Sequence, residues 1–176
     1  VTACEGRYVP LFLSNPTFVQ SLSYLLEQGT VLDVVWVAGC CLCDAGIPGH
    51  SATEVAAVSF LPRLVAILSS EAASLHWKRD AACAIWNAIS DPPGLLSPEQ
   101  SNSHQPNQFM LDYIWSKTGA SNDKLLQACI DLLKVPDMDA VLASLQVLDN
   151  ILRSVSDSRV LFQGLTGVDA LEAVCS

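Results

Sequence analysis

The sequence predicts an all-α fold assembled from recurring helical units, and three observations carry this prediction. Hydrophobic residues make up 51% of the 176 residues and charged residues only 15%, a composition that excludes a disordered chain. Apolar residues recur with the spacing of helices, and no segment has the strand-like alternation bounded by two-residue turns that hairpins need. Similar helical segments also return along the chain, which is typical of repeat proteins.

Three segments are predicted to form the first helix of a unit, because each keeps one side apolar. The segment 19–26 (VQSLSYLL) aligns with 61–68 (LPRLVAIL) at an offset of 42 residues, and 126–133 (LQACIDLL) repeats the pattern 65 residues later. A period near 42 residues lies within the range of about 40 to 47 residues of armadillo and HEAT repeats. A second helix with smaller residues follows each first helix, at 33–43, 80–90 and 139–153.

The longer last interval has a visible cause in the sequence. Segment 91–108 contains four prolines and almost no helical periodicity, so we expect an inserted loop there. One helical unit cannot bury its apolar side alone, so the units are expected to stack in a single array, with approximate units 1–46, 47–105, 106–155 and 156–176. The chain begins with Val and not Met, which favours a fragment of a longer protein.

The charge balance excludes some classes of partner. The chain has 9 Lys and Arg residues against 18 Asp and Glu residues, a formal charge of -9. We therefore expect no direct nucleic-acid binding, because phosphates need a basic surface, and we expect a basic ligand as the natural complement. No stretch approaches the roughly 18 uninterrupted apolar residues of a membrane span, and no secretory signal is visible, so no membrane partner is expected.

Neither metal chemistry nor catalysis is expected. The seven cysteines, an odd number without a secretory signal, are predicted to be reduced, buried thiols. Cys40, Cys41 and Cys43 lack a second Cys or His pair at zinc-site spacing, so no cofactor is predicted and a metal or redox protein stays open only as an alternative. The sequence has no GxSxG, HExxH, Gly-rich phosphate loop or paired-carboxylate motif, so we predict no catalytic residues and a protein that is not an enzyme.

The second unit is specific enough to indicate a family. Residues 60–69 (FLPRLVAILS) followed by 78–87 (KRDAACAIWN) resemble the armadillo repeats of importin-α, which read P-x-L-x-x-L-L and then K/R-E-A-x-W-x-x-S/T-N. Residues 143–153 (ASLQVLDNILR) are similar to the last full repeat of that family, and 167–173 (GVDALEA) to the segment after it. The resemblance covers residues 16–176. It implies a right-handed armadillo α-solenoid of about three repeats and a partial one, from the C-terminal end of the array.

Importin-α proteins are nuclear-import adaptors, so the resemblance implies binding without chemistry. The expected ligand is an extended Lys/Arg-rich peptide or a cargo protein that carries one, such as a nuclear localisation signal, held in an acidic concave groove. In the family this end of the array is associated with the smaller, secondary cargo site. The resemblance further implies importin-β-like and export receptors as partners of the full-length protein, and a location in both cytoplasm and nucleus.

The resemblance also implies which residues bind the peptide. Groove-lining helices of the family carry a Trp and, four residues later, an Asn, and both project from one helix face. The Trp ring packs against Lys and Arg side chains, the Asn amide hydrogen-bonds the peptide backbone, and nearby acidic residues select positive charge. The matching positions in this sequence are Asp33, Trp36, Asp80, Asn87 and Asn150.

The match departs from the family pattern at three other positions. Cys40 replaces the Asn of the first unit, Cys83 replaces the Trp of the second, and Gln146 replaces the Trp of the third. Asp149, beside Asn150, resembles an acidic residue of the family at that position. A complete groove would have three Trp and three Asn residues across the three units. This sequence therefore keeps one Trp and two Asn residues.

Other roles stay open for the same residues. Trp36 has apolar neighbours and fits a buried core position. Asn87 and Asn150 fit solvent-facing positions, and Asp33 and Asp80 fit the first turn of a helix, where the helix dipole favours acidic residues. An armadillo scaffold that assembles other proteins and has no cargo role is the alternative function. The other tryptophans are expected to be packing residues: Trp77, Trp86 and Trp115.

Overall fold

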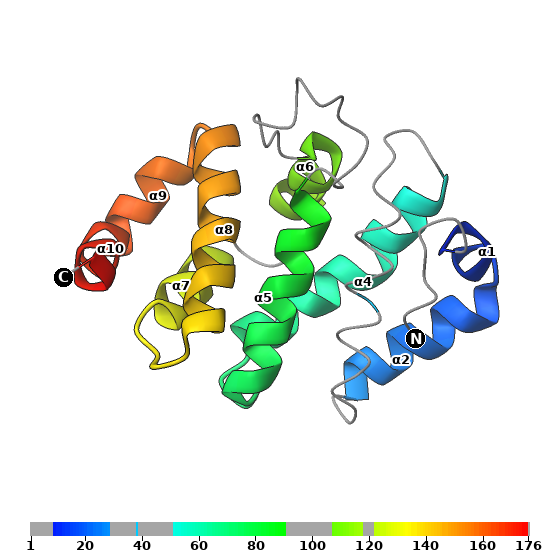
Figure 1. Cartoon of the computed structure of the whole chain (residues 1–176). Coiled ribbons are helices and arrows are strands. Elements are labelled where there is room, and N and C mark those ends of the chain that lie inside the picture. The colour runs from blue at the N-terminus through cyan, green and yellow to red at the C-terminus, as the bar shows by residue number, and fades with distance from the viewer. Residues whose placement is uncertain (1–8, 29–37, 39–50, 91–106, 118–121, 176) are drawn as a thin grey trace, which may run out of the picture.

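The computed structural model describes residues 9–28, 38, 51–90, 107–117 and 122–175. No strand occurs in this part of the chain, which confirms the predicted all-α class. Figure 1 shows the helices in their order along the chain. They are α1 (Val9–Leu13), α2 (Pro16–Gln28), α4 (Ser51–Ser69), α5 (Leu75–Ile89), α6 (Gln108–Lys117), α7 (Asn122–Leu132), α8 (Met138–Ser154), α9 (Ser158–Gly164) and α10 (Gly167–Cys175).

The helices predicted from apolar spacing are present wherever the structure describes their residues. The three predicted first helices correspond to α2, α4 and α7, and two of the predicted second helices correspond to α5 and α8. Most of the remaining predicted second helix, 33–43 of the first unit, lies outside the described residues, as does most of the predicted loop 91–108. Helices α1, α6, α9 and α10 are not predicted individually, because segments of 5 to 10 residues are too short for their period to stand out.

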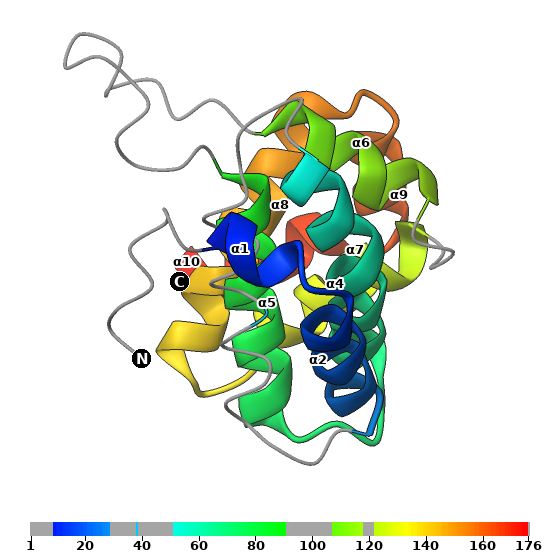
Figure 2. The ribbon, with the colours of Figure 1, turned by 90° about the vertical axis from the view of Figure 1, so that its right-hand side faces the viewer.

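Two rows of helices lie against each other. In one row α2, α4, α7 and α10 each contact the next, and in the other α5 contacts α8. Figure 1 shows α5 and α8 in front, running side by side, and the side view of Figure 2 places them to one side of α2, α4 and α7. Helix α6 contacts α4, α5 and α8, and α9 contacts α7, α8 and α10, so these helices connect the rows.

A hydrophobic core lies between the two rows. Trp77, Trp86 and Trp115 are partly buried and pack against it, as predicted. No described helix is both long and apolar enough to cross a lipid bilayer. The largest fully buried side chains come from α4 to α7: Phe60, Leu61, Leu64, Leu68, Ile85, Ile89, Met110, Leu111, Ile114, Leu125 and Leu126.

Local capping fixes where α5 and α8 begin. The Ser74 Oγ accepts a hydrogen bond from the backbone N–H of Trp77 at 3.4 Å, and the Asp137 carboxylate accepts one from the N–H of Ala140 at 3.1 Å. Each cap satisfies one of the backbone donors that a helix leaves unpaired at its first turn. The first residues of both helices are therefore held in place by the residues just before them.

The last two helices, α9 and α10, meet at a tight junction. Thr166 has a positive φ of 60°, and the buried Gly167 follows it. A Cβ at Gly167 would lie 2.4 Å from the ring of Phe162, whose side chain is in the core. Only glycine lets the backbone approach the ring this closely.

Candidate functional site

The α5–α8 face, formed by the two helices of the front row, carries the predicted site residues that the structure describes. The two helices run in the same direction in Figure 1, so their N-terminal ends lie together. Near the other end Asn150 of α8 donates a hydrogen bond from Nδ2 to the Oγ of Ser90, which caps the C-terminus of α5, at 3.3 Å. This bond joins two helices whose residues are 60 positions apart.

Asn150 is only 9% exposed, so the solvent-facing interpretation of this residue is wrong. A polar amide in this position needs a partner, because burying it unpaired costs free energy. The bond to Ser90 supplies that partner. The structure therefore gives the amide a role between helices, and its predicted bond to a peptide backbone stays a prediction.

Asn87 is half-buried on α5, and no described residue hydrogen-bonds its side-chain amide. It lies seven positions after Asp80, so the two side chains share one side of the helix. No described residue therefore competes with an external partner for the donor or the acceptor of this amide. Among the predicted backbone-binding residues in the described part of the chain, Asn87 best fits that role.

Asp80 is the sixth residue of α5, which begins at Leu75 and has no acidic residue in its first turn. The first-turn interpretation of Asp80 is therefore wrong. Its side chain is 22% exposed and accepts two hydrogen bonds from Arg79, from Nε and Nη2, both at 3.1 Å and both to Oδ1. The Nε2 atom of His76 lies 3.6 Å from the other carboxylate oxygen. The carboxylate of Asp80 is thus hydrogen-bonded to a guanidinium group of the same chain.

Arg79 also reaches the second helix of the face. Its Nη1 lies 3.7 Å from Oδ2 of Asp137, the residue that caps α8. Its Nη2 lies 2.5 Å from Nδ1 of His76. The guanidinium therefore sits between a carboxylate on α5 and a carboxylate at the start of α8.

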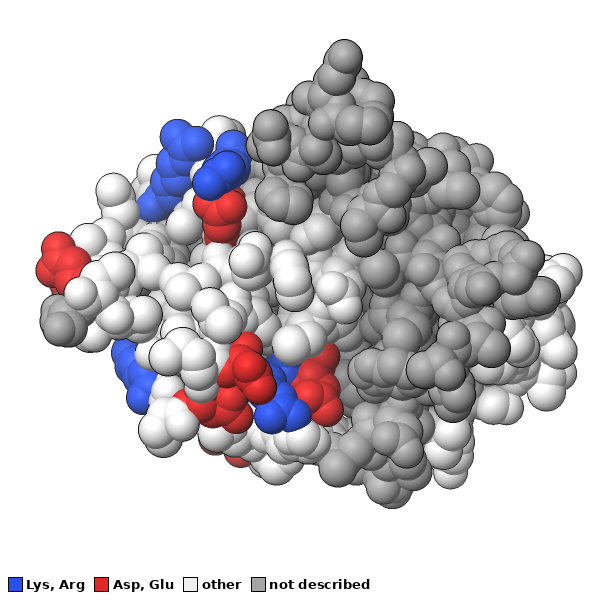
Figure 3. Space-filling view, in the orientation of Figure 1, with Lys and Arg blue, Asp and Glu red and all other residues white. Residues whose placement is uncertain are grey.

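Three carboxylates gather where α5 and α8 begin, and we call Asp80, Asp137 and Asp139 the acidic end. All three carboxylates act on the thiol of Cys83. Burial raises the pKa of this thiol most, and the negative charges of Asp80, Asp139 and Asp137 raise it further, whereas Arg79 lowers it. Figure 3 shows acidic and basic side chains together over the lower ends of these helices, and an uncharged middle of the face. No described group of three His, Cys, Asp or Glu residues has the geometry to hold a metal ion.

The sequence prediction omits Asp137 and Asp139 from the site. Asp139 begins the predicted helix 139–153 and Asp137 lies two residues before it, but an Asp before or in the first turn of a helix is ordinary capping chemistry, so nothing in the sequence singles them out. The acidic residue noted instead, Asp149, is exposed and pairs with Arg153 of its own helix at 2.6 Å. The proximity of α5 and α8 is what brings Asp137 and Asp139 to Asp80.

The remaining predicted site residues, Asp33 and Trp36, lie outside the described residues, as do Cys40, Cys41 and Cys43. The structure therefore brings together Asp80, Asn87 and Asn150 on one pair of helices and leaves the first unit undescribed.

The described cysteines are free thiols, and their burial differs from the prediction. Cys129 is fully buried, and burial raises the pKa of its thiol to about 12. Cys83 is half-buried and Cys175 is exposed. The prediction of a buried thiol is thus right for Cys129 and wrong for Cys175, which lies at the end of the last described helix.

Comparison of this chain with protein-family models, with curated proteins and with solved structures finds no match.

Proposed function

We propose that this chain is a non-enzymatic adaptor of nuclear import, whose α5–α8 face binds a Lys/Arg-rich nuclear-localisation-signal peptide. The observation that carries the proposal is the acidic end, three carboxylates, two of which flank Arg79, at the start of two parallel helices. It is followed along α5 by the amide of Asn87, to which no described residue hydrogen-bonds. The protein would work in cytoplasm and nucleus with importin-β-like and export receptors. Its residues would bind cargo and carry out no reaction.

The proposed architecture is a right-handed armadillo solenoid. Support comes from the contact pattern, in which α2, α4, α7 and α10 each touch the next and α5 touches α8. Contacts restricted to neighbouring units are what a stacked repeat array requires. The proposed groove is then the surface lined by the second helix of each unit.

Binding would combine three contacts. Carboxylates of the acidic end would pair with a Lys or Arg side chain, as charge-assisted hydrogen bonds are stronger than neutral ones. The Asn87 amide would hydrogen-bond the peptide backbone with its donor and its acceptor. Met138 and Leu142 of α8, which are 70% and 50% exposed, would give the aliphatic parts of the peptide side chains an apolar surface near Gln146, the residue that replaces a Trp.

A second candidate is an armadillo scaffold that assembles other proteins and has no cargo role. The observation that favours it is the state of the face itself, because Arg79 already pairs with Asp80, and Asn150 already bonds to Ser90. Such a face is stable without a ligand.

Fluorescence anisotropy with a labelled bipartite Lys/Arg-rich peptide separates the two functions. The adaptor predicts binding that weakens steeply with salt and falls about tenfold in Asp80→Asn, since one charged contact contributes on the order of 1.4 kcal/mol. The matched control is Asp131→Asn, which removes the same charge from an exposed position on α7, outside the α5–α8 face. Absence of binding at high micromolar protein, or equal weakening in both variants, would favour the scaffold.

A further inference from the structure

Among the described residues, the cation that pairs with the acidic end is the guanidinium of Arg79. We infer that Arg79 is an internal competitor of the basic peptide: it occupies the carboxylates that would otherwise bind a Lys or Arg of the ligand, and so sets the affinity of the α5–α8 face. This inference rests on the proposed function and concerns the regulation of the same site.

The contacts of Arg79 are those that a ligand arginine would make. Nε and Nη2 donate to Oδ1 of Asp80 at 3.1 Å each, and Nη1 lies 3.7 Å from Oδ2 of Asp137 on the neighbouring helix. The guanidinium is a planar fork of donors that matches carboxylates, and it is charged at every physiological pH. The group is 23% exposed, so it lies at the surface of the face and is not sealed in the core.

Arg79 leaves part of the acidic end available, so a ligand can begin to bind before Arg79 moves. The carboxylate of Asp139 is exposed, and no hydrogen bond or ion pair joins it to another described residue. The Asp137 contact at 3.7 Å is longer than a hydrogen bond, and that carboxylate is held in place by its bond to Ala140 N–H. An incoming cation would meet Asp139 first and then displace Arg79 from Asp137, and finally from Asp80.

The net charge of the acidic end predicts whether removal of Arg79 strengthens or weakens peptide binding. Three carboxylates and one guanidinium leave the acidic end with two net negative charges, and removal of the guanidinium would leave three. A cationic ligand would then be attracted more strongly and would no longer have to break the Arg79 contacts. A purely structural role of Arg79 predicts the opposite, because losing a tie between α5 and α8 would disorder the face and weaken binding.

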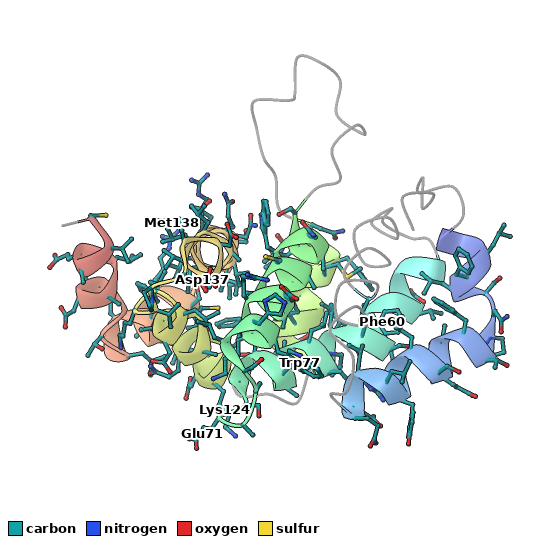
Figure 4. The ribbon with its side chains drawn as sticks, turned by 60° about the horizontal axis from the view of Figure 1, so that its bottom comes forward. Phe60, Glu71, Trp77, Lys124, Asp137 and Met138 are labelled. Atoms are coloured by element: carbon teal, nitrogen blue, oxygen red, sulfur yellow. The ribbon has the colours of Figure 1, made fainter. Side chains whose placement is uncertain are left out.

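Lys78 provides a matched control. It precedes Arg79 in α5, but it lines a cavity of about 550 Å³ together with Glu71 and Lys124. Figure 4 shows Glu71 and Lys124 together at the lower edge of the view, apart from Asp137. Lys78→Gln therefore removes the same charge as Arg79→Gln from the same helix without freeing a carboxylate of the acidic end.

The test is the affinity of the labelled Lys/Arg-rich peptide for wild type, Arg79→Gln, Lys78→Gln and Asp80→Asn, with thermal unfolding measured for each. We expect Arg79→Gln to bind about three- to tenfold more tightly with a steeper salt dependence, and Lys78→Gln to change affinity less than twofold. Arg79→Lys keeps the positive charge and loses the forked set of guanidinium donors, so it should give an affinity between those of wild type and Arg79→Gln. It replaces Arg79→Gln in the test if that variant does not fold.

The other outcomes separate this inference from the proposed function. Unchanged or weaker binding by the Arg79 variants, with binding still weakened about tenfold in Asp80→Asn relative to wild type, would overturn the internal competition and leave the adaptor role standing. No binding by wild type or by any folded Arg79 variant at high micromolar protein would overturn both, because release of the carboxylates would then have uncovered no site.

Discussion

Asn150 on α8 hydrogen-bonds to Ser90, the residue that caps the C-terminus of α5, through Nδ2 and Oγ at 3.3 Å. The amide that the importin-α resemblance assigns to a peptide backbone is therefore also a link between the two helices of the α5–α8 face. Stability and binding measurements on the same variants can tell these two roles apart.

Loss of this link should destabilise the fold. Asn150→Ala is expected to lower the free energy of unfolding by about 1 to 2 kcal/mol, since it removes a hydrogen bond and leaves the Ser90 hydroxyl without its partner. Ser90→Ala should cost less, and a double-mutant cycle from urea unfolding should give a coupling of about 0.5 to 1 kcal/mol. Additive effects of the two substitutions would contradict the link.

The same pair of variants tests the binding role of the amide. If Asn150 also contacts the peptide, Asn150→Ala should weaken peptide binding more than Ser90→Ala does, because only the first removes the amide. Equal effects on affinity would mean that Asn150 serves the fold alone.

Gly167 should be the most sensitive glycine of the two that the structure describes. In Gly167→Ala the new Cβ would collide with the Phe162 ring at 2.4 Å, and Phe162 is packed in the core, so we expect a loss of about 1 to 3 kcal/mol of unfolding free energy. Gly164→Ala is the control, since nothing lies within 4 Å of its new Cβ and helix propensity favours Ala. Thermal or urea unfolding of the two variants measures the difference, and equal stabilities would contradict the close approach.

Cys129 should make the fold less stable in alkaline solution. Its folded pKa of about 12 lies above the ordinary value of 9.0, so between these values the folded state keeps a proton that the unfolded state loses. The contribution of this thiol is thus fully present below pH 9 and falls by about 1.4 kcal/mol per pH unit up to about pH 12. Urea unfolding of wild type and Cys129→Ala between pH 8 and 10.5 should show the stability difference between them shrinking as pH rises. A difference that is constant with pH would contradict the burial of the thiol.

Helical class and the positions of the long helices could be predicted from the sequence because their signal is local. The apolar residues of α4, α5 and α8 repeat over 15 to 19 residues, which is enough for the period to be visible. The short helices α6 and α9 have only about two to three turns each, so their apolar residues show no clear period. The tryptophans Trp77, Trp86 and Trp115 pack against the core, as the sequence also indicates.

The candidate site was less accessible to prediction because it is made by contacts between units. Asp80 and Asn87 follow from the pattern of one helix. By contrast, the role of Asp137 depends on α8 lying beside α5, and the Asn150–Ser90 bond spans 60 residues of sequence. Arg79 is adjacent to Asp80 in sequence, yet its reach to Asp137 appears only when the two helices are placed together.

The most direct test of the central claim, that the α5–α8 face binds a basic peptide, is a titration of the isotopically labelled chain with the bipartite Lys/Arg-rich peptide, followed by NMR. We predict that the side-chain amide signals of Asn87 and the backbone signals of Asp80, Asp137 and Asp139 shift in a saturable, salt-sensitive manner, while those of α4 and α7 stay unchanged. Saturable shifts confined to the row of α4 and α7, or none at millimolar peptide, would contradict the claim.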